Sequence, residues 1–164
     1  MIKLIVLDVD GSMTNGHITY DAHGIESKSF NVKDGLGITT WLKIGGEATI
    51  ITGRTSAIVE RRAKELGIVH FYQGVKNKKE VLENLMKMLD ISPSEVAVIG
   101  DDLNDIGMFK IAAQSFAPAD AMDVAKEHAS VVLQKRGGEG AVREMIDMLV
   151  EANGWKKRFE QIWL

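Results

Sequence analysis

Short runs of apolar residues, uninterrupted by polar ones, recur along this chain. The first is formed by residues 4–7, with the sequence Leu-Ile-Val-Leu. Because polar and apolar positions do not alternate there, the run predicts a strand buried on both faces, as in a parallel sheet. Similar runs predict further short strands at 46–53, 70–74, 96–102 and 129–134.

Amphipathic stretches lie between these runs. Residues 55–67 begin with Thr55 and Ser56, which suit a helix N-terminus, and end at Gly67, which suits a C-terminus. Residues 77–90 repeat this design, with apolar side chains spaced for one buried face. Strands that alternate with helices predict right-handed crossovers and a parallel sheet covered on both sides. The predicted fold class is therefore a doubly wound α/β fold.

The segment 12–33 does not fit this alternation of strands and helices. Its spaced apolar residues predict two short strands around a turn at 21–24; they are Ile18, Tyr20, Ile25 and Phe30. The segment is too short to form a cap domain. It is either an ordinary surface hairpin or a flap that covers a site or pairs with another subunit.

The bulk composition narrows the class of protein. The chain has 164 residues, of which 45% are hydrophobic and 26% charged, so we expect one globular domain over residues 1–164. A net charge of -3 argues against a nucleic-acid partner, which usually requires a clustered basic excess. No cysteine is present to form a disulfide or a thiolate metal site. No apolar run approaches the length of a membrane span, and we expect a cytoplasmic location without a membrane partner.

Polar residues with useful chemistry follow the predicted strands. They are Asp8 and Asp10 after the first strand, Thr52, Gly53 and Arg54 after the second, Lys78 at the start of the helix 77–90, and Asp101, Asp102 and Asp105 after the strand within 96–102. The carboxyl ends of parallel strands meet at one edge of a sheet, where ligands bind, so one pocket should gather these residues. Carboxylates without histidine or cysteine form a hard oxygen site that suits Mg²⁺. Hydroxyl, glycine and lysine groups beside it suit a phosphate.

These residues predict the hydrolysis of a phosphate ester. Asp8 would attack the phosphorus atom and form an aspartyl-phosphate, because Mg²⁺ offsets the repulsion between the carboxylate and the phosphoryl oxygens. Asp10 lies two residues further and points to the same side of an extended chain. It would protonate the leaving alkoxide and later take a proton from the attacking water.

The motifs DVDGSMT, TGR, NK and GDDLND resemble, in order, the four motifs of the haloacid dehalogenase-like phosphatases. The resemblance covers essentially the whole chain and implies their Rossmann-like fold. The absence of a cap domain, the flap, FNVKDGLGI and the late GGEGAVRE look like the 3-deoxy-D-manno-octulosonate 8-phosphate phosphatases of lipopolysaccharide sugar synthesis. Close relatives of that family act on nine-carbon keto-deoxy sugar acid phosphates, which we keep as the alternative substrate.

The resemblance also implies a role for each matching residue. Asp8 would be the nucleophile, Asp10 the acid and base, and Thr52 and Lys78 the phosphate holders. Mg²⁺ would be bound by the Asp8 side chain, the Asp10 carbonyl and Asp101. The remaining implied residues are Asp102 and Asp105 in support, with Asp105 orienting water or Lys78, and Asn31, Val32, Lys33, Asp34, Gly35, Gly53, Arg54 and Arg62, together with Asp10, at the substrate.

Two positions bear on the choice of sugar. The nine-carbon branch tends to carry an acidic residue where this chain has Arg54, which favours the eight-carbon substrate. Thr39, in contrast, stands where several octulosonate phosphatases carry an arginine, so one sugar contact is in question. The resemblance further implies a homotetramer whose flaps associate and whose C-terminal tail, here 154–164, reaches a neighbouring site.

Several alternatives remain open from the residues alone. The segment KRGGEGAVRE is either a capped helix start or an anion site at a helix N-terminus. The tail could pack as a small helix on its own domain or dock on another subunit. A receiver domain also combines a parallel sheet, a phosphorylated aspartate, Mg²⁺ and a lysine, and a non-catalytic phosphate-binding domain is a further class. The D-x-D arrangement on the first strand favours hydrolysis over both.

Overall fold

A six-stranded parallel sheet forms the centre of the molecule. The computed structural model describes residues 1–164. The strand order is β5-β4-β1-β6-β7-β8, and every neighbouring pair is parallel. The strands span Leu4–Leu7 (β1), Glu47–Ile51 (β4), His70–Tyr72 (β5), Val96–Ile99 (β6), Gln114–Ala117 (β7) and Val131–Val132 (β8). The predicted doubly wound α/β fold is confirmed, and β7 is the one strand of this sheet that the sequence did not predict.

Strand β1 lies at the middle of this sheet and explains the first apolar run. Leu4 pairs with Glu47 on one side and with Val96 on the other. All four residues of β1 are fully buried, because each face of the sheet is covered by helices. Leu4 and Val6 face one apolar cluster, while Ile5 and Leu7 face the other. The uninterrupted hydrophobic run is therefore the signature of burial on both faces.

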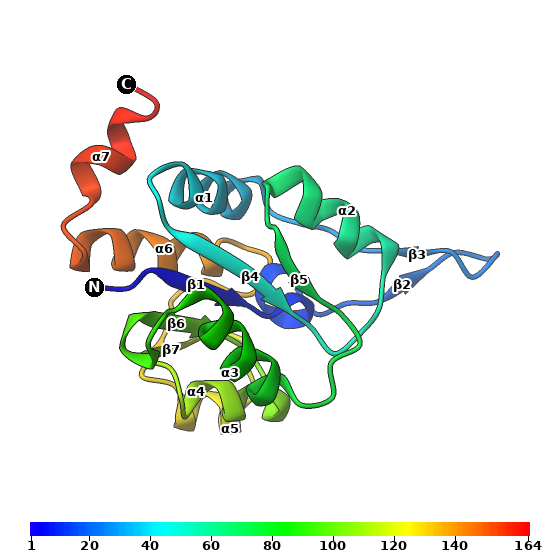
Figure 1. Ribbon diagram of the computed structural model, residues 1–164. Coiled ribbons are helices and arrows are strands. Elements are labelled where there is room, and N and C mark those ends of the chain that lie inside the picture. The colour runs from blue at the N-terminus through cyan, green and yellow to red at the C-terminus, as the bar shows by residue number, and fades with distance from the viewer.

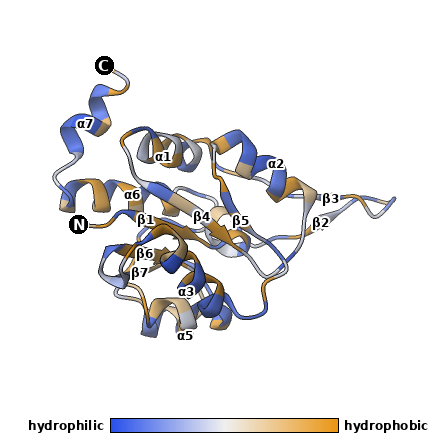
Figure 2. Cartoon of the chain, in the orientation of Figure 1, coloured by the Kyte–Doolittle hydropathy of each residue, from blue (hydrophilic) through white to orange (hydrophobic).

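Helices cover both faces of the sheet (Figure 1). Those on one face are α1 (Val32–Lys43), α2 (Ala57–Leu66) and α6 (Ala141–Ala152); those on the other are α3 (Lys78–Leu89), α4 (Ile106–Phe109) and α5 (Asp123–His128). Figure 2 shows hydrophobic strands at the centre and mixed colouring on the helices, as expected for amphipathic elements. Ser56 caps α2, and Gly67 ends it in the left-handed region. No helix is long and apolar enough to cross a membrane.

A small antiparallel hairpin projects from the body of the molecule beyond the end of β1 (Figure 1). It consists of β2 (Thr19–Tyr20) and β3 (Glu26–Ser27), with Tyr20 opposite Glu26. The turn at 21–24 is the predicted one, and a side-chain oxygen of Asp21 accepts hydrogen bonds from the backbone of His23 and Ile25. The segment 12–33 thus forms the predicted hairpin, although its last two residues already belong to α1.

The tail packs on its own chain. Helix α7 (Lys156–Gln161) places Phe159 in the core, and the indole of Trp163 donates a hydrogen bond of 2.9 Å to the Thr40 hydroxyl. Lys43 lies over the Trp163 ring. Within the single chain, the tail therefore packs as a small helix on its own domain.

Candidate active site

The nucleophile candidate stands where β1 gives way to a tight turn. Asp8 follows β1, and its backbone N–H donates to Ile99 O at 3.2 Å. The next five residues, Val9–Met13, form a tight turn (η1) whose backbone is non-helical at Asp10 and Gly11. Gly11 has φ +102°, and a Cβ atom at this position would overlap the carboxylate of Asp101. Glycine is therefore required for the turn and for the approach of Asp101 to it.

Lys78 joins two of the carboxylates. It is the first residue of α3 and is buried, and its Nζ donates to Asp8 Oδ1 and to Asp105 Oδ1, each at 2.7 Å. Burial by itself lowers the pKa of Lys78, but the charges of Asp8 and Asp105 outweigh burial and raise it above the ordinary value. Lys78 thus stays charged at the base of the site and fixes the orientation of the Asp8 carboxylate.

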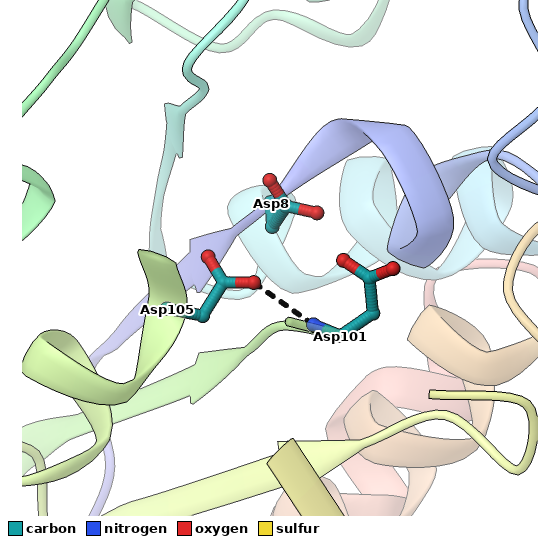
Figure 3. A group of neighbouring side chains, drawn as sticks. All are labelled: Asp8, Asp101 and Asp105. Carbon is teal, nitrogen blue, oxygen red and sulfur yellow. Dashed lines mark hydrogen bonds between the residues drawn. The ribbon is translucent and has the colours of Figure 1, made fainter. Parts of the chain in front are cut away.

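Asp105 is a structural carboxylate within this group. Its Oδ2 accepts hydrogen bonds from the backbone N–H of Asp101 at 2.9 Å and of Asp102 at 3.3 Å, while Oδ1 accepts from Lys78. Figure 3 shows Asp105 reaching the Asp101 backbone in this way. Three donors thus engage Asp105, and its role is to orient Lys78 and the 101–102 backbone.

Asp8 and Asp101 are the carboxylates left for a cation. Asp8 Oδ2 is buried and has no hydrogen-bond partner. Burial, with the negative charge of Asp105, raises the pKa of Asp8 well above its ordinary value and that of Asp101 to about 6. Ligand atoms of Asp8, Asp101 and Asp105 lie within 4.8 Å of one another. An all-oxygen donor set that accumulates uncompensated negative charge fits Mg²⁺.

A small polar pocket of about 200 Å³ opens above these carboxylates. Its lining contains no hydrophobic residue and consists of Asp8, Asp10, Thr52, Gly53, Arg54, Asp101, Asp102 and Asn104. Seven of the eight were predicted to converge at this sheet edge, and the structure brings them together. Asn104 was not predicted as a site residue, although its place in GDDLND, one residue before Asp105, was a signal.

The hairpin contributes further groups at the rim of the pocket. Nζ of Lys28 lies 2.5 Å from Asp10 Oδ1 and 3.7 Å from Glu26 Oε1. Arg54 lies 3.4 Å from both the Tyr20 hydroxyl and Glu26 Oε1. Lys28 was not predicted as a site residue; it lies directly after β3, two residues beyond Glu26.

The segment 31–35 and Arg62 lie outside this pocket. Val32 and Lys33 are exposed, whereas Asn31 caps α1 and donates from Nδ2 to Gly138 O at 3.2 Å. Arg62 lies over the ring of Phe30, and a Cβ atom on Gly35 would overlap its guanidinium group. Of these residues, Val32 and Arg62 line a neighbouring hollow together with Phe30.

Asp34 is buried behind the same segment. Its Oδ1 accepts a hydrogen bond of 2.9 Å from the backbone N–H of Arg143 at the start of α6, and its Oδ2 has no partner. Burial raises the pKa of Asp34 to about 6, although Arg62 and Arg143 lower it in part. The position of this side chain fits support of the segment from behind better than contact with a ligand.

The glycine-rich loop before α6 packs against the turn after β1. Gly138 N donates to Ser12 O at 3.1 Å, and a Cβ atom on Gly137 would overlap the carbonyl of Gly11. Glu144 accepts hydrogen bonds from the backbone N–H groups of Gln134 and Lys135. Helix α6 begins directly after this segment, at Ala141, without a side-chain cap, and the glycines permit close backbone packing beneath the site.

Comparison with known proteins gives consistent results. Residues 67–146 match the model of a family described as haloacid dehalogenase-like hydrolase. The chain is 40% identical to the 3-deoxy-D-manno-octulosonate 8-phosphate phosphatase KdsC of Haemophilus influenzae over 159 residues, covering 97% of this chain and 88% of that protein. Identity to the corresponding protein of Escherichia coli is 44% over 153 residues, covering 93% and 81%.

A solved structure shares the fold closely. The 3-deoxy-D-manno-octulosonate 8-phosphate phosphatase of Moraxella catarrhalis, in complex with magnesium ion, phosphate ion and KDO molecule, matches with a TM-score of 0.93. The two chains are 40% identical, and the match covers 98% of this chain and 93% of the other.

Proposed function

Because this chain belongs to the haloacid dehalogenase-like hydrolases, in the family of the 3-deoxy-D-manno-octulosonate 8-phosphate phosphatases, we propose that it hydrolyses that eight-carbon ester to the sugar acid and phosphate. The similarity over 97% of the chain carries the choice of substrate. The pocket supports phosphate-ester hydrolysis as the reaction, since Asp8 and Asp10 line it and the buried Lys78 donates to Asp8.

Mg²⁺ is the cofactor that the donor set fits. The carboxylates of Asp8 and Asp101 and the carbonyl of Asp10 would hold it. When bound, it neutralises the charge that the carboxylates and a phosphoryl group bring together and stabilises charge in the transition state. The unpartnered Oδ2 of Asp8 and the raised pKa of Asp101 are the observations that support a cation here.

The residues of the pocket then divide the reaction between them. The carboxylate of Asp8 attacks phosphorus, and the P–O bond to the sugar breaks. Asp10 gives its proton to the departing sugar oxygen. A water molecule then attacks phosphorus of the aspartyl-phosphate, Asp10 takes the proton back, and Asp8 is released with inorganic phosphate.

Lys78 and Thr52 hold the phosphoryl group during both steps. An ammonium group has three donors, and two of those on Lys78 are occupied by Asp8 and Asp105. One donor therefore remains for a phosphoryl oxygen. Thr52 lines the pocket with a hydroxyl-bearing side chain and can donate to a second oxygen.

The sugar acid would lie beyond the phosphate, toward the hairpin. Arg54 is at the pocket rim and is the proposed partner of the sugar carboxylate. We propose Asn31, Val32, Lys33 and Arg62 for more distant contacts, with Asp34 and Gly35 shaping their segment.

A homotetramer and a cytoplasmic location complete the proposal. Exposed apolar side chains on α1 and α6, among them Val32, Leu36 and Met148, support assembly through a surface of this kind. A charged phosphate ester does not cross a membrane unaided, so enzyme and substrate would share a compartment. Light scattering should give four times the 18.0 kDa chain mass, and a monomer would contradict the assembly.

The reaction is tested by measuring phosphate release with Mg²⁺ from the eight-carbon and nine-carbon keto-deoxy sugar acid phosphates, hexose phosphates and p-nitrophenyl phosphate. We expect the eight-carbon ester to be preferred and EDTA to abolish release. Preference for the nine-carbon ester would keep the mechanism and overturn the substrate. If no ester releases phosphate with the metal present, the enzymatic proposal fails and a receiver or binding domain becomes the better interpretation.

A further inference from the structure

The hairpin carries a lysine, outside the four motifs, whose side chain is shielded from solvent. Lys28 follows β3 and is half-buried as a residue, but its side chain has 0% exposure, whereas hairpin residues 21–25 are exposed. Lysine is almost never fully buried unless its charge is paired. Its partners here are Asp10 and Glu26. Because Asp10 lines the pocket, the Lys28 side chain joins the hairpin to the pocket.

Like Asp8, whose carboxylate accepts a hydrogen bond only from Lys78, Asp10 is held by a single lysine, Lys28. Asp105 is engaged by three donors, and Asp8 is held by a buried lysine from α3. The carboxylate of Asp10 accepts a single hydrogen bond, from Lys28 to Oδ1. The next residue, Gly11, has a φ of +102° and no side chain that could hold the Asp10 carboxylate.

We propose that Lys28 is a positioning residue for the reaction. It holds Oδ1 of Asp10 and thereby directs the other oxygen of that carboxylate toward the leaving oxygen of the ester. The hairpin would then be part of the catalytic apparatus, in addition to shaping the entrance to the pocket. This inference rests on the proposed reaction, in which Asp10 is the acid and base.

Two other roles for Lys28 make different predictions. If the lysine contacted the phosphoryl group directly, its loss would raise KM for every phosphate ester to a similar degree. If it only fastened the hairpin, any residue that keeps the hairpin folded would serve, and the leaving group would not matter. A residue that positions a general acid matters most when the leaving group is a poor one, because a good leaving group departs with little proton transfer.

The experiment compares Lys28→Met, which removes the charge at similar length, with Lys28→Arg, which keeps it. Lys87→Met, on the exposed side of α3, is the control for loss of one lysine charge. For each variant, kcat/KM is measured with the sugar acid phosphate, which has an alkyl leaving group, and with p-nitrophenyl phosphate, which has an aryl one. Because kcat/KM reports only steps up to the release of the first product, the comparison isolates the cleavage step.

We expect Lys28→Met to lower kcat/KM about 10-fold to 100-fold for the alkyl ester and less than about 3-fold for the aryl ester. Lys28→Arg should restore the alkyl ester to within about 5-fold of the wild type, and Lys87→Met should match the wild type on both esters. With the aryl ester, Lys28→Met should also show a burst of one p-nitrophenolate per active site, because Asp10 is then poorly placed to activate water in the second step.

Equal losses on both esters, or equal losses in the Met and Arg variants, would overturn the positioning role. A wild-type protein that cleaves neither ester would instead overturn the proposed function, so the two failures are distinguishable. Circular dichroism and thermal unfolding of each variant show whether the chain has folded. A Lys28→Met variant that unfolds would leave Lys28→Arg and a Lys28→Gln variant to carry the same comparison.

Discussion

Replacing Asp34 by asparagine should change how the stability of the protein depends on pH. Asp34 is buried, and its pKa is raised from 3.8 to about 6. Between these two values the unfolded chain has released its proton while the folded chain still holds it. Stability is therefore fully present below about pH 4 and is lost as the pH rises through 6, because ionisation then favours the unfolded chain.

The expected magnitude follows from the size of the shift. A rise of about two pKa units corresponds to about 3 kcal/mol between the fully protonated and fully ionised limits. Between pH 4.5 and 7.5, where the experiment is practical, about 2 kcal/mol of this remains. Asparagine keeps an acceptor for the Arg143 N–H but cannot ionise, so Asp34→Asn should lose this part of the pH dependence.

The assay is urea unfolding of the wild type and Asp34→Asn at several pH values. Subtracting the two free energies of unfolding cancels the titration of the active-site carboxylates, which both proteins share. A constant offset reflects the changed hydrogen bonding and carries no information here. Asp147→Asn is the matched control, since Asp147 is exposed on α6 and pairs with Arg143.

A pH-independent difference between wild type and Asp34→Asn would refute the reasoning, as would an equal slope in Asp147→Asn. The kinetic counterpart separates support from substrate contact. We expect KM of Asp34→Asn to stay within about 3-fold of the wild type, whereas a rise of more than about 10-fold at constant kcat would show direct binding of the sugar by Asp34.

Three further changes probe the site itself. Asp8→Asn should lower kcat by about 10⁴-fold or more while circular dichroism stays unchanged, because it removes the nucleophile at nearly constant volume; retained turnover would exclude an aspartyl-phosphate on Asp8. Lys78→Met should lower the free energy of unfolding at pH 8 by about 3–5 kcal/mol, measured in urea, because Asp8 and Asp105 are left buried without their shared cation; a neutral effect would contradict that pairing. Gly11→Ala should weaken the activation of phosphate release by Mg²⁺, measured as the metal concentration for half-maximal rate, since its Cβ overlaps Asp101; an unchanged value would show that the turn can relax.

The pocket could be predicted from the sequence because its parts sit at strand ends. Uninterrupted apolar runs predicted the strands, and the carboxyl ends of parallel strands lie at the same edge of a sheet. Asp8, Thr52 and Asp101 therefore had to meet whatever the details of the packing. The strand β7 escaped prediction because it begins with Gln114 and Ser115, whose polar side chains break the apolar signal; Ser115 bonds with Ser130 beside β8.

Contacts between distant segments could not be predicted in the same way. No local sequence pattern indicates that Asp34 accepts a hydrogen bond from the backbone of Arg143, or that Gly137 lies against Gly11. Each depends on how two helices and a loop pack on one face of the sheet. The burial of Lys28 likewise depends on where the hairpin leans, which strand alternation does not reveal.

These distant contacts explain why the backbone of the turn 9–13 is held by the main body of the molecule, whereas the carboxylate of Asp10 is held by the hairpin. Asp101, after β6, lies against Gly11, and Gly137, in the loop before α6, lies against the carbonyl of Gly11, so the backbone of the turn is contacted from two sides. The carboxylate of Asp8 is likewise held in place, because it accepts a hydrogen bond from Lys78 at the start of α3. Asp10 lies on the same turn, but its carboxylate is held from the hairpin, an element that contributes no strand to the main sheet. Asp8 and Asp10, the proposed nucleophile and acid, are thus held by different parts of the molecule, and movement of the hairpin would displace Asp10 while leaving Asp8 in place.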